Sequence, residues 1–77
     1  MKKTLAECEE GTSAVVREIR GGSGIHRKLN RLGINPGDPI RVLRGGFLGG
    51  PVLVEIHGVA LGIGHGMAEK VEVEISE

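Results

Sequence analysis

Four residues of this chain could bind a transition metal or act through a thiol or imidazole group. They are Cys8, His26, His57 and His65. Thiolate and imidazole are good ligands for iron and zinc. No two of the four follow the C-x-x-C or H-x-x-x-H spacing of a local site, so a shared site would need distant segments to converge. We therefore expect no cofactor beyond a weakly bound divalent transition metal, Fe²⁺ or Zn²⁺, with these four residues as its weak candidate ligands.

Catalytic motifs give no support for an enzyme. The glycine clusters match neither a Walker loop, which needs Gly-Lys-Ser/Thr, nor a dinucleotide fingerprint with its acidic residue downstream. The segment 62–66 reads GIGHG and lacks the Lys and Ser/Thr of a phosphate-binding loop. We expect this segment to be a flexible loop, and we predict a non-enzymatic protein without catalytic residues.

Two groups of residues are candidates for binding a partner. Phe47 and Leu48 form an apolar pair between two Gly-Gly pairs, where the tip of a hairpin is expected. The pair either contacts a partner or a second copy of the chain, or folds back into the core. The second group is basic and lies on a short predicted helix, where it either docks on a partner or is merely solvated. It consists of Arg27, Lys28 and Arg31.

Short apolar segments separated by glycines predict the strands that position these residues. We expect strands at 14–19, 41–44, 52–56 and 70–75, which are rich in β-branched residues. The last segment alternates strictly, so that Val71, Val73 and Ile75 face a core while glutamates face water.

One helix interrupts the strands. Ser23 can cap its start, and Gly33 supplies the left-handed residue that ends it. Its apolar stripe consists of Ile25, Leu29 and Leu32, which have the i, i+4, i+7 spacing of one helix face. The predicted core joins this stripe to the strands and consists of Val16, Ile19, Ile25, Leu29, Leu32, Val42, Val54, Ile56, Val71 and Val73.

The length of the chain, 77 residues, allows one modest core, so we expect a single domain over residues 1–77. Closing a small sheet into a barrel would remove its exposed edges. The sequence therefore predicts a fold of the all-β (mainly β) class. We expect a small five-stranded SH3-like barrel with one short inserted α-helix.

Charge and hydropathy narrow the choice of partner. Seven basic and two acidic residues lie between 17 and 44, a balance of +5, whereas residues 45–77 have a balance of −4. This asymmetry either orients a partner or is neutralised between neighbouring strands. Zero net charge and a single aromatic residue argue against nucleic-acid binding. A lone cysteine and the lack of a signal peptide or membrane-spanning run favour a cytoplasmic protein without direct membrane insertion.

The run LNRLGINPGDPIRV from Leu29 to Val42 resembles the FeoA family, the ferrous-iron transport protein A, in which a helix leads into a strand. Gly50-Pro51-Val52, Gly58-Val59-Ala60-Leu61 and the closing 71–73 segment extend the resemblance over nearly the whole chain. It departs from the family at 62–66, where many members carry basic residues. The resemblance implies an SH3-like fold, a cytoplasmic location and association with the cytoplasmic region of the GTPase-bearing transporter FeoB.

Three alternatives to this function stay open at the level of sequence. They are a nucleic-acid-binding module, an SH3-like module of the kind that ends some iron-responsive repressors, and a soluble transition-metal carrier. Association of two copies into a homo-oligomer also stays open.

Overall fold

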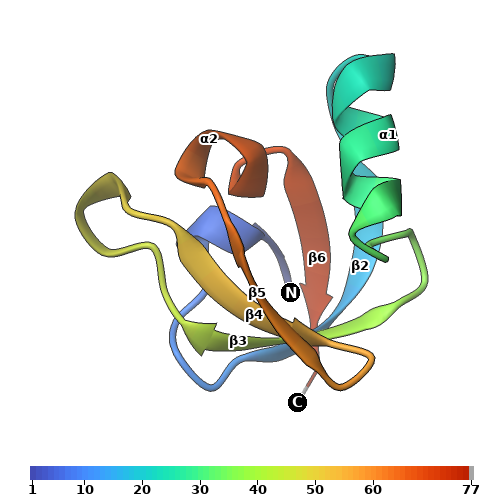
Figure 1. Ribbon diagram of the computed structural model, residues 1–77. Coiled ribbons are helices and arrows are strands. Elements are labelled where there is room, and N and C mark those ends of the chain that lie inside the picture. Colours follow the sequence, from blue (N-terminus) through green and yellow to red (C-terminus); the bar gives the residue numbers. More distant parts are fainter. Residues whose placement is uncertain (77) are drawn as a thin grey trace.

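The fold is a six-stranded antiparallel sheet wrapped into a barrel-like shape, with one helix inserted after the second strand (Figure 1). The computed structural model describes residues 1–76, apart from the side chain of Phe47. The strands are β1 (Lys2–Thr4), β2 (Ser13–Ile19), β3 (Pro39–Arg44), β4 (Val52–Ile56), β5 (Val59–Ile63) and β6 (Val71–Ile75). The helices are α1 (Ser23–Arg31) and α2 (His65–Ala68), and the 3₁₀ turns are η1 (Leu5–Glu7) and η2 (Phe47–Gly49).

The predicted mainly β, SH3-like fold is confirmed, and the sheet differs from the expected barrel in two respects. The strand order is β1-β6-β2-β3-β4-β5, with one strand more than expected. The additional strand is the short polar β1, which pairs with β6 at the other end of the sequence. Since β1 and β5 do not pair with each other, the sheet is not closed by hydrogen bonds and keeps two edges. The segment 62–66 is not a flexible loop: it ends β5 and begins α2.

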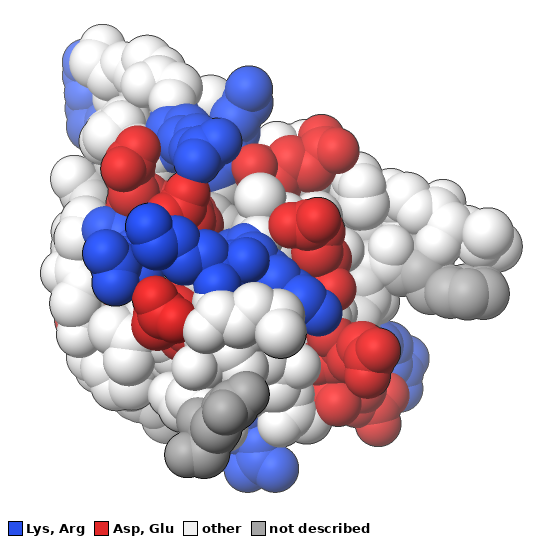
Figure 2. All heavy atoms as spheres, turned by 180° about the vertical axis from the view of Figure 1, so that it is seen from behind, with Lys and Arg blue, Asp and Glu red and all other residues white. Residues whose placement is uncertain are grey.

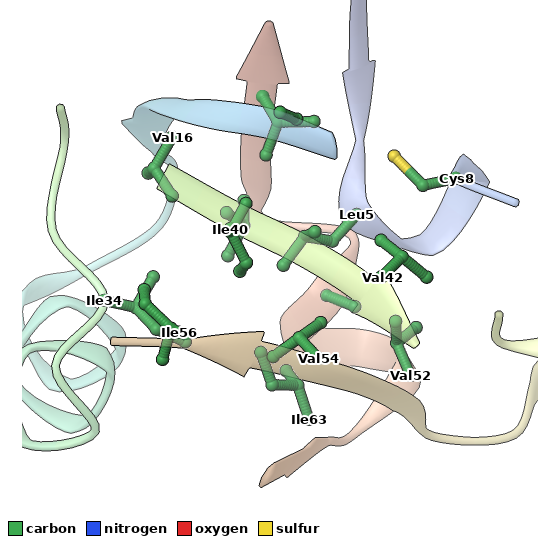
Figure 3. Close-up of a cluster of buried hydrophobic side chains, with 14 of the residues drawn as sticks. Leu5, Cys8, Val16, Ile34, Ile40, Val42, Val52, Val54, Ile56 and Ile63 are labelled. Atoms are coloured by element: carbon green, nitrogen blue, oxygen red, sulfur yellow. The ribbon is translucent and has the colours of Figure 1, made fainter. Parts of the chain in front are cut away.

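Aliphatic side chains from every large element fill the interior. Figure 3 shows Leu5 of η1, Val42 of β3, Val54 of β4 and Ile63 of β5 converging there. Eight of the ten predicted core residues are buried, and Ile25 packs partly buried against the cluster. Residues outside the predicted core set complete the core; they are Leu5, Cys8, Ala14, Ile34, Ile40, Val52, Ile63 and Ala68.

Leu32 is the one predicted core residue that is exposed, with 37% of its surface accessible. The reason is the way in which α1 ends. The N–H of Gly33 donates to Asn30 O at 3.0 Å and that of Ile34 donates to Leu29 O at 2.9 Å, with Gly33 at φ 86°. This is a Schellman motif, which folds the residue after the glycine back onto the last helical turn. Ile34 is therefore buried where Leu32 was expected.

The start of α1 also differs from the prediction. Gly22 is the N-cap residue, and Ser23 is the first residue of the helix and makes no capping hydrogen bond with its side chain. Gly33 does end the helix as expected.

No helix within residues 1–76 is long and apolar enough to cross a membrane.

Candidate docking site

The loop of residues 45–50, between β3 and β4, projects from one end of the barrel (Figure 1). Leu48 lies at its tip with 91% of its surface exposed. Its backbone is left-handed, with φ 56° and ψ 36°, a conformation that glycine adopts freely but that costs most L-residues about 1–2 kcal/mol. Leu48 therefore does not fold back into the core. Its backbone is in an unfavourable conformation that no burial of the side chain compensates.

The base of this loop is held by close packing of two glycines. A Cβ atom on Gly45 would lie 3.1 Å from Cys8 O. On Gly46 it would lie 2.9 Å from Gly50 O, 3.0 Å from Val52 Cγ2 and 3.1 Å from His65 Nδ1. Only glycine fits between these atoms without displacing backbone. The base of the loop thus packs closely against the segment after η1 and against α2, and Leu48 projects from this base.

A depression of about 380 Å³ lies beside the loop base. It is lined by Ala6, Cys8, Glu9, Glu10, Arg44, Gly45 and Gly46. Glu9, Glu10 and Arg44 are exposed charged residues that no motif in the sequence marked. Together the depression and Leu48 offer an apolar projection next to a recess bordered by charged side chains, which we call the loop surface.

Cys8 is one of the residues that line this recess, but its side chain is packed against the chain. The side chain is buried, and Sγ donates to Thr4 O at 3.4 Å. Burial raises the pKa of the Cys8 thiol, so the group stays protonated at neutral pH. A protonated, buried thiol is a poor nucleophile and a poor metal ligand.

Glu7 holds the turn η1, which leads directly into Cys8 and the segment that packs on the loop base. Its Oε1 accepts hydrogen bonds from the backbone N–H of Thr4 at 2.8 Å and from the Thr4 hydroxyl at 3.2 Å. These bonds favour the ionised form and lower the pKa of the Glu7 carboxyl.

The histidines occupy three separate elements. His26 is exposed on α1, and His57 lies in the β4–β5 turn with Nε2 3.5 Å from Asp38 Oδ1. His65 begins α2 with Nε2 3.8 Å from Glu69 Oε2. The structure does not bring these imidazoles and Cys8 together, and residues 1–76 contain no group of three or more His, Cys, Asp or Glu side chains placed to hold one metal ion. Weak binding of Fe²⁺ or Zn²⁺ stays a prediction.

The predicted basic residues Arg27, Lys28 and Arg31 lie exposed on α1 and line, with Ser23 and Gly24, a shallow hollow of about 390 Å³. Helix α1 contains no acidic residue. Among the ion pairs of residues 1–76, none involves these three side chains. We call them the helix surface.

Other charges are partly neutralised across strands. Arg17 pairs with Glu74 at 3.2 Å, and Arg20 pairs with Glu72. Figure 2 accordingly shows basic and acidic side chains interleaved over the back of the molecule. Neutralisation between neighbouring strands therefore accounts for part of the charge asymmetry and leaves the basic charge of α1 without a partner in the described part of the chain.

The structure separates the two sets of predicted partner-binding residues. In Figure 1, α1 and the loop of residues 45–50 project from opposite sides of the barrel. They do not form one patch. Of the predicted apolar pair, Leu48 is exposed, whereas the Phe47 side chain lies outside the described residues. A role for either surface in binding stays a prediction.

Comparison with known protein families shows the family to which the chain belongs. The model of the FeoA domain matches residues 3–75. The chain belongs to the FeoA domain family. A Methanocaldococcus jannaschii protein provisionally named Fe(2+) transport protein A is 37% identical over 73 residues, which cover 95% of this chain and 87% of that protein.

Solved structures of FeoA proteins share the fold. The crystal structure of an iron uptake regulatory protein, FeoA, superposes with a TM-score of 0.94 at 34% identity and covers 99% of this chain and 100% of its own. Stenotrophomonas maltophilia FeoA, solved with zinc, has a TM-score of 0.79 at 30% identity over 94% of this chain and 89% of its own. A manganese-dependent transcriptional repressor at 22% identity has a TM-score of 0.89, and this chain covers 42% of it. That match concerns the fold alone.

Proposed function

We propose that this FeoA-family chain is a cytoplasmic, non-enzymatic accessory protein of ferrous-iron uptake that acts by binding the cytoplasmic region of the GTPase-bearing transporter FeoB. Its relatives support the iron-transport part of the proposal. The Methanocaldococcus protein carries a name in Fe(2+) transport. The Stenotrophomonas protein is described as an SH3 domain protein with a suggested role as a ferrous iron transport activating factor.

The observation that supports action by protein contact is the loop surface. An exposed leucine in a left-handed conformation, on a loop whose base tolerates only glycine, is costly for the isolated fold. Binding would offset this cost, because an apolar side chain presented on a rigid base enters a partner's pocket with little loss of conformational entropy. The helix surface would add charge that steers the approach of a partner with acidic groups.

A pull-down from detergent-solubilised membranes of the source organism tests the proposal. The tagged chain and its Leu48→Ala variant serve as matched baits, because the truncated side chain is exposed and the fold should be unaffected. We expect the parent chain to retain FeoB and the variant to retain several-fold less. Retention of nucleic acid or of stoichiometric metal, with no FeoB, would refute the proposal.

A further inference from the structure

The two edges of the sheet are protected very differently. β1 is a three-residue strand that begins with two lysines, and its backbone lies next to the charged N-terminus. Short edge strands with lysines resist pairing with other chains. β5 has five residues, VALGI, with no charge and no proline. It is the last strand beside β4, and Figure 1 shows it crossing the front of the barrel.

The β4–β5 hairpin fixes which backbone groups of β5 point away from the sheet. Ile56 and Val59 face each other across a two-residue turn whose residues, His57 and Gly58, have φ values of 50° and 79°. This is the type I′ geometry, in which the flanking pair is hydrogen-bonded. Antiparallel ladders alternate, so the groups of residues 59, 61 and 63 point to β4. The N–H and C=O groups of Ala60 and Gly62 therefore point outward.

Within residues 1–76, these outward groups have no backbone partner. The space beside them is open, since a Cβ on Gly62 or on Gly64 would meet nothing within 4 Å. The apolar side chains of the strand are also incompletely covered. Val59 is 58% exposed and Leu61 is half-buried. An uncharged edge with free backbone groups and accessible apolar side chains is a template for another strand.

From this geometry we infer that β5 is a self-association edge, at which it pairs antiparallel with β5 of a second copy of the chain. The strand is complementary to itself in one register. With Leu61 on the two-fold axis, Ala60 faces Gly62 of the second copy, and the two residues whose groups point outward exchange hydrogen bonds. Leu61 then faces its own counterpart as a non-hydrogen-bonded pair, and Val59 faces Ile63.

The side chains favour this occupant. On one face of the paired strands, the aliphatic residues Val59, Leu61 and Ile63 would face one another. On the other face, the small residues Ala60 and Gly62 would face each other. Aliphatic cross-strand pairs stabilise a sheet, and like charges directly opposite would destabilise it. Because β5 has no charge, a copy of itself meets no repulsion. Val59 and Leu61 would lose their remaining contact with water.

Sedimentation equilibrium of the purified chain between about 1 μM and 1 mM, the range where weak specific contacts appear, tests this inference without any transporter present. We expect a monomer–dimer equilibrium. Ala60→Pro removes an outward N–H, which a lone edge strand tolerates, so the fold should persist while dimerisation weakens about tenfold or more. Ala60→Ser, which changes the same exposed position but keeps the outward N–H, is the control and should dimerise like the parent. A chain that stays monomeric throughout, or a dimer unaffected by Ala60→Pro, would overturn the inference.

Cysteine cross-linking keeps the test decisive if Ala60→Pro does not fold. In a Cys8→Ala background, Leu61→Cys would place two thiols on the axis, at a Cα separation that suits a disulfide. We expect it to form a covalent dimer at least about ten times faster than Leu53→Cys, which lies on β4 away from the axis. Equal rates would contradict the pairing. A monomeric chain whose binding to FeoB is lost with Ala60→Pro would mean that the edge receives a strand of the transporter instead.

Discussion

The loop surface and the helix surface lie at opposite sides of the same barrel and are built by different physics. The loop places an apolar side chain in an unfavourable backbone conformation and secures it through glycines that fit tightly against neighbouring backbone. The helix presents three cations on a regular scaffold whose one buried residue is Leu29. The loop surface is distinguished by its backbone geometry, whereas the helix surface is distinguished from the rest of the molecule by its positive charge alone. In the proposed function, the apolar anchor and the steering charges therefore lie on separate patches of one small domain.

The largest expected effect concerns the core on which both surfaces depend. Val73 lies fully buried in β6, between β1 and β2. Val73→Asp would place a carboxylate without a partner in an aliphatic interior, which costs several kcal/mol in a domain with about 5 kcal/mol of stability. We expect the variant to be unfolded by circular dichroism and to lose both surfaces at once. A wild-type melting temperature would refute the assignment of this strand face.

Matched glycine substitutions separate the two surfaces by their effect on stability. Gly46→Ala would push a methyl group against Gly50 O and His65, so we expect a loss of about 1–3 kcal/mol in the free energy of unfolding. Gly24→Ala on α1 meets nothing within 4 Å and should gain up to about 1 kcal/mol, because alanine is the better helix former. Urea denaturation measures both. Equal changes for the two variants would contradict the difference in packing.

Leu48 should show a trade-off between stability and binding. Asparagine adopts the left-handed region more readily than leucine, so Leu48→Asn should leave stability unchanged or raise it by up to about 1 kcal/mol. The same change removes the apolar anchor and should weaken FeoB binding about tenfold, or 1.4 kcal/mol. Thermal unfolding and titration calorimetry measure the two effects. A less stable variant that binds normally would reverse the interpretation.

Acid should loosen the loop end before the helix end, and this effect is the smallest. The folded pKa of Glu7 is lowered by its bonds to Thr4, so its stabilising contribution is complete above the ordinary glutamate pKa of about 4.3. The contribution is lost as the pH falls through the lower folded value. Amide NMR shifts of η1 and the loop should move below about pH 4.3, while those of α1, which contains no acidic residue, move less. Glu7→Gln should reduce the difference.

The sequence predicted the features that local patterns determine. Strict alternation identified β6, and Gly33 marked the end of α1. Geometry that depends on distant residues could not be predicted. The turn at Gly33 buries Ile34 in place of Leu32. The pairing of β1 with β6 joins the two ends of the chain. The close contacts of Gly45 and Gly46 are with the segment after η1 and with α2. Whether Leu48 points outward was open in the sequence, because a Gly-Gly pair on each side allows both directions.

The most direct test of the account is the dissociation constant for the purified FeoB cytoplasmic domain as a function of ionic strength. Three chains are compared: the parent, Leu48→Ala, and a triple variant with Arg27→Glu, Lys28→Glu and Arg31→Glu, each first shown to be folded. Leu48→Ala should weaken binding about tenfold at every salt concentration, since an apolar contact is not screened. The triple variant should bind weakly at low salt and approach the parent near 1 M, where the screening length is about 3 Å. If both variants bind as tightly as the parent at all salt concentrations, neither surface docks on the transporter and the account is wrong.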